Sequence, residues 1–175
     1  MALIYADGSC IPNPGIMGIG IVYRKLDHAF SACLGGGTNQ VAELFALYAA
    51  IELADVGDFI FTDSNYAVKV ARSEWRAHCY QDLISLIRNS LIEKRIRLQW
   101  VQGHSGHVLQ QRADRVANRA ARKRRPRIEP QVVSVSAWVA RCQAALTRDP
   151  VGREGLQTVD HADVGFTSGR NGEHA

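Results

Sequence analysis

The chain has 175 residues, 46% hydrophobic and 22% charged, which is enough for one domain with a hydrophobic core and an appendage. The N-terminus has no charged stretch followed by an apolar one, and no apolar run is as long as a membrane span, so neither a signal peptide nor a membrane protein is expected. The 4 cysteines form no C-x-x-C pair, which indicates neither a disulfide framework nor a zinc knuckle and favours a reducing, cytoplasmic location.

The net charge of +4 is unevenly divided along the chain. Residues 1–68 carry 2 basic and 7 acidic side chains, residues 69–127 carry 15 basic and 4 acidic, and residues 128–175 carry 4 basic and 6 acidic. A basic middle section is typical of a protein that binds a polyanion. A basic helical face exposed to solvent would give the same counts, so the charge alone leaves both interpretations open.

The N-terminal part of the chain predicts three strands in succession. Residues 3–6 are an apolar run that predicts a buried strand, with Asp7 at its end and a turn over 8–15. Further strands are expected over 18–25 and 28–34. Antiparallel pairing of these three strands is the simplest arrangement.

A glycine stretch at 35–37 predicts a flexible loop, and Thr38 after it is a residue type that begins helices. The helix expected over 41–55 is apolar almost all round, which indicates deep packing. Glu43 is out of place in it, because no basic residue lies within a helical turn and an unpaired buried carboxylate is unfavourable.

The next strand, expected over 58–62, ends in another acid, Asp63. Sites gather at such strand ends in open α/β sheets. The remaining expected elements of the compact part are helices over 65–75 and 79–95, a strand over 96–101, and a helix over 108–123 that carries Asp114.

Six basic side chains follow between residues 119 and 127, and prolines at 126 and 130 prevent a helix there. We expect a compact domain over 1–122, a basic, proline-containing linker over 123–133, and a C-terminal extension over 134–175. In the extension, residues 134–147 predict one amphipathic helix, and the polar, glycine-rich residues from 149 predict a disordered tail.

Four acids occupy unusual positions: Asp7, Glu43, Asp63 and Asp114. Taken singly, Asp7 could hydrogen-bond the amides of its turn, and Glu43 could stabilise its helix through the helix dipole. Together, four converging carboxylates without lysines would repel one another strongly unless cations bind between them. Oxygen ligands favour magnesium or manganese over zinc. Two such ions, about 3.5–4 Å apart, are used in phosphodiester hydrolysis.

Four motifs resemble those of ribonuclease H of type 1, in the family's order and with close to its spacing. They are DGSCIPNPG at 7–15, GGTNQVAE at 36–43, TDS at 62–64 and WVQGHSGHVLQQRAD at 100–114. The resemblance covers about residues 1–122. It implies an α/β, RNase H-like fold: a five-stranded mixed sheet, with three antiparallel strands and then two parallel ones, flanked by helices.

The resemblance also implies a function and a site. The expected activity is endonucleolytic hydrolysis of the RNA strand of RNA–DNA hybrids with two Mg²⁺ ions, for which Mn²⁺ could substitute, leaving 5′-phosphate and 3′-hydroxyl ends. The four acids match the family's metal ligands, and His104 matches its mobile catalytic histidine, whereas His107 is expected to be structural. The residues expected to contact the hybrid are Cys10, Asn13, Asn39, Gln40 and Asn65. We expect a monomer that does not contact membranes.

The sequence departs from the family pattern in two places. The segment between Asp63 and Trp100 is too short for the basic insertion with which many bacterial members grip DNA, and Gln111 stands where relatives often have an acid. The basic residues between 119 and 127 are a candidate replacement for the insertion.

Three other functions stay open at this stage. A proofreading-type exonuclease of the same fold is disfavoured, because it would have an acid at the position of Ser9. A non-catalytic hybrid-binding module would be expected to lack one of the four acids. A nuclease of a retroelement or phage is a third possibility, and it would act in trans because the chain is too short to include a polymerase.

Overall fold

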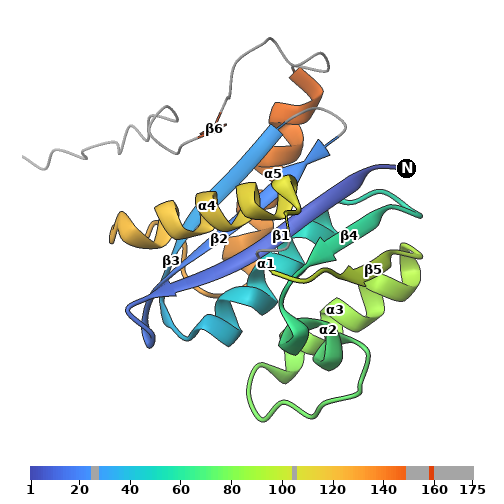
Figure 1. Cartoon of the computed structure of the whole chain (residues 1–175), viewed down its shortest axis with the longest axis horizontal. Helices are drawn as coiled ribbons and strands as arrows, with labels where there is room; N and C mark the ends of the chain where they lie inside the picture. The colour runs from blue at the N-terminus through green and yellow to red at the C-terminus, as the bar shows by residue number, and fades with distance from the viewer. Residues whose placement is uncertain (25–27, 104–105, 149–157, 160–175) are drawn as a thin grey trace, which may run out of the picture.

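The computed structural model describes residues 1–24, 28–103, 106–148 and 158–159 (Figure 1). Its centre is a mixed sheet with the strand order β5-β4-β1-β2-β3-β6. The long strands β1 (Leu3–Ile11), β2 (Gly15–Tyr23) and β3 (His28–Gly37) are antiparallel to one another. The short strands β4 (Phe59–Thr62) and β5 (Arg97–Trp100) extend the sheet in parallel on the other side of β1. The predicted five-stranded mixed sheet is therefore confirmed, and the two-residue strand β6 (Thr158–Val159) is added beside β3.

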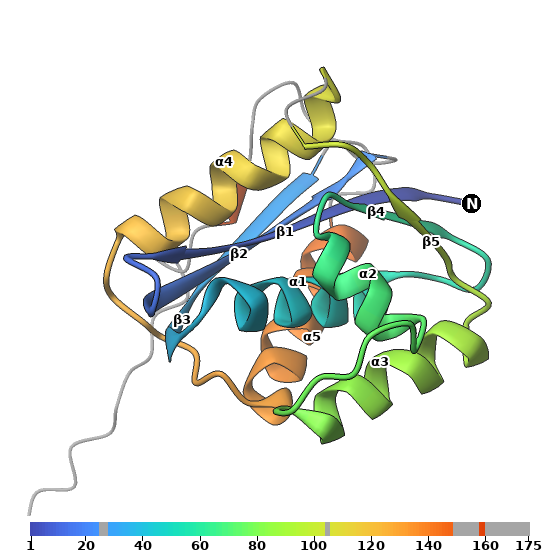
Figure 2. The ribbon, with the colours of Figure 1, turned by 60° about the horizontal axis from the view of Figure 1, so that its bottom comes forward.

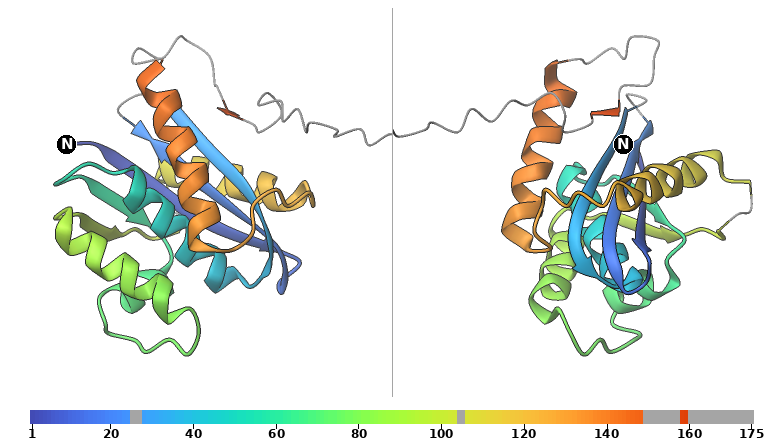
Figure 3. Two further views of the ribbon diagram at one scale, coloured as in Figure 1. Left: turned by 180° about the vertical axis from the view of Figure 1, so that it is seen from behind. Right: turned by 90° about the vertical axis from the view of Figure 1, so that its left-hand side faces the viewer.

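Helices cover both faces of this sheet (Figures 2 and 3). Within the described ranges, α4 (Val108–Arg122) is the one helix that covers the first face. The other face carries the remaining helices of the described residues: α1 (Asn39–Leu53), α2 (Asn65–Ala71), α3 (Gln81–Glu93) and α5 (Val132–Arg148). No helix in the described part of the chain combines the length and the hydrophobicity that crossing a membrane requires.

The alternation of side chains along β2 separates the two layers. Met17, Ile19 and Ile21 are fully buried and belong to the large core on the α1 side. Gly18 and Gly20 face α4, where a Cβ would lie 2.2 Å from the carbonyl oxygen of Ala117 and 2.4 Å from that of Ala113, respectively. The helix therefore rests directly on the backbone of the strand, and the two glycines make this close approach possible.

Two strands are longer than the sequence predicts. Asp7 is predicted at the end of its strand, but β1 continues as far as Ile11, which is paired with Ile16 of β2. The glycines at 35–37 belong to β3 instead of forming a loop, because Gly37 pairs with Gly15. Pairing within the sheet thus overrides weak local strand propensity. In contrast, α2 ends at Ala71, earlier than predicted, and Ser73 after it has a φ of 64°.

The C-terminal helix α5 packs along α1 and lies on the opposite side of the sheet from α4 (Figure 3). Its buried side chains Val135, Trp138, Val139 and Cys142 belong to the large core. The hydroxyl groups of Ser136 and Tyr48 are 2.7 Å apart and hydrogen-bonded, which ties α5 to α1. The tail predicted from residue 149 lies outside the described residues, apart from β6.

Candidate active site

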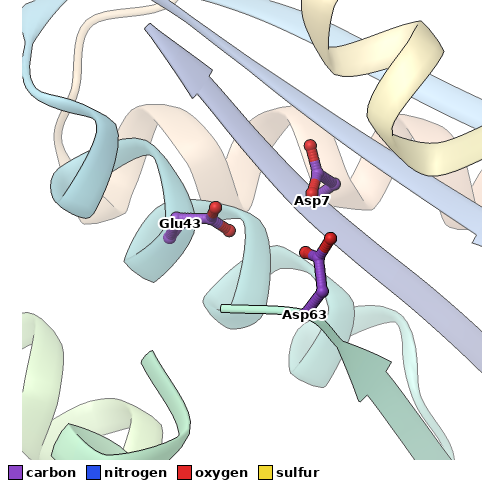
Figure 4. A group of neighbouring side chains, drawn as sticks. All are labelled: Asp7, Glu43 and Asp63. Carbon is purple, nitrogen blue, oxygen red and sulfur yellow. The ribbon is translucent and has the colours of Figure 1, made fainter. Parts of the chain in front are cut away.

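Three carboxylates converge where β1 and β4 separate (Figure 4). Asp7, Glu43 and Asp63 each offer one oxygen atom, and these atoms all lie within 4.8 Å of one another. Asp7 and Glu43 are buried, with 5% and 9% of their surface exposed, and Asp63 is half-buried. Carboxylate oxygens without histidine or cysteine form a donor set that suits a hard divalent cation such as Mg²⁺ or Mn²⁺.

Asp7 reaches this place through the alternation of β1. Leu3 and Tyr5 pack in the small core beneath α4, so Asp7, two residues further, lies on the same face of the sheet. The parallel ladder between β1 and β4 ends with Tyr5 and Phe61. Asp7 therefore lies just beyond the ladder, on a strand held rigidly by β2.

Glu43 comes from the opposite layer, from the first turns of α1. The side chain of Thr38 begins this helix by accepting a hydrogen bond from the backbone N–H of Val41. The backbone N–H of Gly8 donates to Oε2 of Glu43 over 3.1 Å. A Cβ at Gly8 would lie 2.3 Å from the backbone nitrogen of Glu43, so a glycine is needed for α1 to approach β1 this closely.

Asp63 lies in the short connection between β4 and α2. Its backbone carbonyl accepts a hydrogen bond of 3.0 Å from the indole N–H of Trp100 in β5. Directly after it, the side chain of Ser64 begins α2 by accepting from the backbone N–H of Ala67. These two contacts fix the backbone on both sides of the carboxylate.

Asp114 lies on α4 beside this group but is not one of the three closest acids. Its Oδ1 accepts a hydrogen bond from Nδ2 of Asn118, and Oδ1 of Asn118 accepts one of 2.9 Å from the hydroxyl of Ser9. Asp114 is near enough to contribute to raising the pKa values of Asp7 and Glu43. A chain of hydrogen bonds from β1 thus holds the carboxylate of Asp114 at the edge of the cluster.

Burial and mutual repulsion oppose ionisation of these acids. Burial, the charges of Glu43 and Asp63, a hydrogen bond with Asp63, and the charge of Asp114 raise the pKa of Asp7 from 3.8 to about 10. Burial and the charges of Asp63 and Asp114 raise the pKa of Glu43 from 4.5 to about 8, against the lowering effect of the Gly8 amide. Bound cations would reverse this preference, because they stabilise the ionised carboxylates.

Gln110, which lies within the fourth motif but was not expected to be a site residue, contacts the cluster. Its side chain is 2% exposed, and Nε2 lies 3.2 Å from Oδ1 of Asp63 and 3.4 Å from Oδ1 of Asp7. A glutamine gives no metal-ligand signal. Helical spacing could have indicated that Gln110 is buried, because it lies on the same side of α4 as the buried residues Ala113 and Ala117.

The residues predicted to contact substrate lie mainly around the turn between β1 and β2. Asn39 accepts a hydrogen bond from the backbone N–H of Cys10, and its own backbone N–H donates to the side chain of Asn13, both over 3.1 Å. The thiol of Cys10 is buried and points to the carbonyl groups of Pro12 and Gly37. Gln40 and Asn65 are exposed near the starts of α1 and α2. His104 lies outside the described residues.

Comparisons with known proteins agree with this arrangement. A family model described as RNase H matches residues 1–122. The chain is 34% identical over 142 residues to a ribonuclease HI of Caulobacter vibrioides, covering 71% of this chain and 95% of that protein. It is 33% identical over 135 residues to a ribonuclease H of Pectobacterium atrosepticum, covering 67% of this chain and 88% of that protein.

A solved structure of similar fold is RNase H1 from the halophilic archaeon Halobacterium salinarum. It matches with a TM-score of 0.56 at 25% sequence identity, covering 70% of this chain and 98% of that one. The chain belongs to the RNase H family, type 1, and is thereby a ribonuclease H.

Proposed function

We propose that this ribonuclease H is an endonuclease that hydrolyses the RNA strand of RNA–DNA hybrids with two bound Mg²⁺ ions. This proposal rests mainly on one observation: three acids have carboxylate oxygens within 4.8 Å of one another. The proposed ligands are Asp7, Glu43, Asp63 and Asp114. When bound, such ions activate a water molecule for attack on phosphorus and stabilise the departing 3′ oxygen, which gives 5′-phosphate and 3′-hydroxyl ends.

The chain contributes rigidity and charge to this reaction. Asp7 is fixed by strand pairing, Glu43 by the amide of Gly8, and Asp114 by Asn118, so the ligands need little reorganisation when cations bind. His104 is proposed to relay protons or to help the product leave, since it lies in the glycine-containing segment between β5 and α4.

Recognition of the hybrid is proposed for the surface beside the turn between β1 and β2. Asn13 and Asn39 bring amide groups to this turn, together with the backbone of Cys10, and Gln40 and Asn65 add exposed amides at the starts of α1 and α2. Amide groups can both donate to and accept from a 2′-hydroxyl, the group that distinguishes RNA from DNA.

We further propose that a basic segment grips the phosphate backbone in place of the missing insertion. The basic segment is Arg119, Arg122, Lys123, Arg124, Arg125 and Arg127, and all six residues are exposed. Several earlier basic residues are already engaged: Arg72, Arg88 and Lys94 donate to the backbone carbonyls of Leu98, Val70 and the end of α1. Exposed basic side chains are densest at the end of α4 and just after it, where six of the nine residues 119–127 are basic.

The basic segment lies at the same end of the sheet as the turn between β1 and β2 (Figure 2). Gly18 packs against the backbone of Ala121 near the end of α4, and the backbone N–H of Arg127 donates to the carbonyl of Cys33 in β3. A duplex bound along the β1–β2 turn would thus have its backbone beside these arginines.

Cleavage of a labelled RNA–DNA hybrid in Mg²⁺ tests the proposed activity, with single-stranded RNA and duplex DNA as substrate controls. We expect Asp7→Asn to abolish turnover while the circular dichroism spectrum is retained. Asp55→Asn, the same change at an exposed acid after α1, should cleave like the wild type. Hybrid cleavage by Asp7→Asn at the wild-type rate would refute the assignment of the metal site.

The salt dependence of KM tests the basic segment. Deleting everything after Ala121 would also remove the buried helix α5, so substitution is the cleaner experiment. In the triple variant Arg122→Gln, Arg124→Gln, Arg125→Gln, we expect KM to rise and the slope of log KM against log salt to decrease by about 0.9 for each phosphate that the protein no longer neutralises.

A triple variant with the same net charge, Arg24→Gln, Arg95→Gln, Arg141→Gln, changes exposed arginines elsewhere and controls for the total charge. If both triple variants shift KM and its slope equally, the basic segment has no specific role in binding.

A further inference from the structure

A single amide group of α4 joins the backbone of β1 to two acids of the cluster. Nε2 of Gln110 lies 3.1 Å from the carbonyl oxygen of Ala6, 3.2 Å from Oδ1 of Asp63 and 3.4 Å from Oδ1 of Asp7. The ladder between β1 and β4 ends at Tyr5. Gln110 therefore satisfies the Ala6 carbonyl at the point where the ladder stops and directs its remaining hydrogen toward the two carboxylates.

The orientation of this amide follows from its surroundings. Oε1 of Gln110 is buried and has no hydrogen-bond partner among the described residues. Turning the amide over would bring Oε1 against three acceptor oxygens and leave Nε2 unpaired instead, which is less favourable. An unsatisfied buried acceptor is unfavourable and calls for an explanation, and the contacts of Nε2 with the two acids provide one.

The neutral charge of the side chain matters as much as its reach. A lysine or arginine at this position would place a positive charge where a cation is needed, and an acid would add to the repulsion among the carboxylates. An apolar residue could not donate a hydrogen bond to the carbonyl of Ala6 or to the acids. An amide N–H can hold both Asp7 and Asp63 without neutralising either, and each carboxylate keeps further lone pairs for a metal ion.

We propose that Gln110 is a positioning residue of the metal centre, which holds the carboxylates of Asp7 and Asp63 in a ligating arrangement before a cation binds. The inference rests on the proposed function in so far as the acids bind divalent metal. Hydrogen-bond partners of ligating carboxylates typically contribute about 10–100-fold to metal affinity.

The test is titration of the substrate-free protein with Mn²⁺ by calorimetry, comparing the wild type with Gln110→Met. Methionine has a similar length and fills the buried space but cannot donate a hydrogen bond. We expect the Mn²⁺ dissociation constant to rise by about 10–100-fold. Gln143→Met is the matched control, because Nε2 of Gln143 donates to the backbone carbonyl of Glu52 over 3.0 Å on the exposed side of α5, away from the acids.

The unfolding free energies of both variants, measured with urea in EDTA, show whether Gln110 positions the acids or only stabilises the fold. A lower unfolding free energy with an unchanged Mn²⁺ dissociation constant would overturn the inference, and so would unchanged binding with unchanged stability. If Gln110→Met does not fold, Gln110→Asn provides the comparison, since it keeps the amide but is one methylene shorter. Weaker Mn²⁺ binding by Gln110→Asn would then support the inference, and wild-type affinity would overturn it.

Asp7→Asn in the same titration distinguishes this inference from the metal assignment itself. If the wild type binds no Mn²⁺, or if Asp7→Asn binds it as tightly as the wild type, the assignment of the acids as a metal site fails. If Asp7→Asn loses binding but Gln110→Met does not, only the role of Gln110 fails.

Discussion

Asp7 lies at the centre of the acid cluster and is the residue most affected by it. It is buried beneath α4, and Glu43, Asp63 and Asp114 all add repulsion to the effect of burial on its pKa. Without cations the most favourable state of this cluster contains protons, which neutralise some of the carboxylates. Protons and metal ions therefore compete for the same oxygens, and the stability of the metal-free protein depends on pH.

We expect the unfolding free energy of the metal-free protein to fall as the pH rises from about 5 to about 9. The pKa values of Asp7 and Glu43 are raised by folding, to about 10 and about 8, so the folded state holds protons that the unfolded chain has already released. This contribution is fully present below about pH 4, the ordinary pKa of these groups, and is lost as the pH passes through the raised values. Its slope is at most about 1.4 kcal/mol per pH unit for each group.

Urea unfolding in EDTA at several pH values measures this slope. Asp7→Asn should match the wild type near about pH 5 and exceed its stability near about pH 9, because the amide never acquires a charge. Excess Mg²⁺ should flatten the wild-type profile by binding the ionised acids. Identical slopes for the wild type and Asp7→Asn would show that Asp7 does not titrate with a raised pKa.

The helix α4 links residues of the active site to the sheet. Its residues Gln110, Asp114 and Asn118 recur every fourth position, and through them the helix contacts β1 and the acids. The distance between helix and sheet is set at Gly18 and Gly20, where side chains are absent from β2. A shift of α4 away from the sheet would therefore move every polar contact that the helix makes with the site.

Gly20→Ala tests this packing. The new Cβ would lie 2.4 Å from the carbonyl oxygen of Ala113, so the helix must move, and we expect a loss of about 1–3 kcal/mol in the unfolding free energy. Gly36→Ala is the control in the neighbouring strand β3, because nothing lies within 4 Å of its added Cβ. Urea unfolding measures both variants. Equal stability of Gly20→Ala and the wild type would mean that the contact between α4 and β2 is loose.

The elements differ in how far sequence could predict them. Periodicity and the four motifs identified the family and the mixed sheet, and both are confirmed. The role of Gln110 could not be predicted, because it depends on which face of α4 meets β1, and the glutamines of the fourth motif do not show which of them faces the acids. The sequence did not predict that residues 35–37 belong to a strand, because glycines have low strand propensity. In the structure, pairing with β2, for example of Gly37 with Gly15, outweighs that preference.

At the scale of the whole molecule, the hydrophobic core extends beyond the part that matches the family. The family match ends at residue 122, whereas the buried side chains of α5 share one core with those of α1 and the sheet. Trp138 is among the largest of them and is 2% exposed. The helix α1, which carries Glu43, is thus enclosed between the sheet and the C-terminal helix.

Trp138→Ala should lower the unfolding free energy by about 3–5 kcal/mol, as expected for removing a large aromatic side chain from a core. Val133→Ala, at a position of α5 that is 78% exposed, should change it by less than about 0.5 kcal/mol. Thermal and urea unfolding check both values. If Trp138→Ala is as stable as the wild type, α5 does not contribute to the core of the folded domain.

The packing of α5 on α1 also affects how the chain folds during translation. Roughly 80 residues separate the end of α1 from the start of α5, and at about 5–20 residues per second they take on the order of 4–16 s to synthesise. Throughout this interval the apolar surface of α1 has no partner from α5. A nascent chain released early, or stalled before α5, would expose this surface and be a target for chaperones and proteases. Of the described helices, the last to leave the ribosome is therefore the one that protects the helix carrying Glu43.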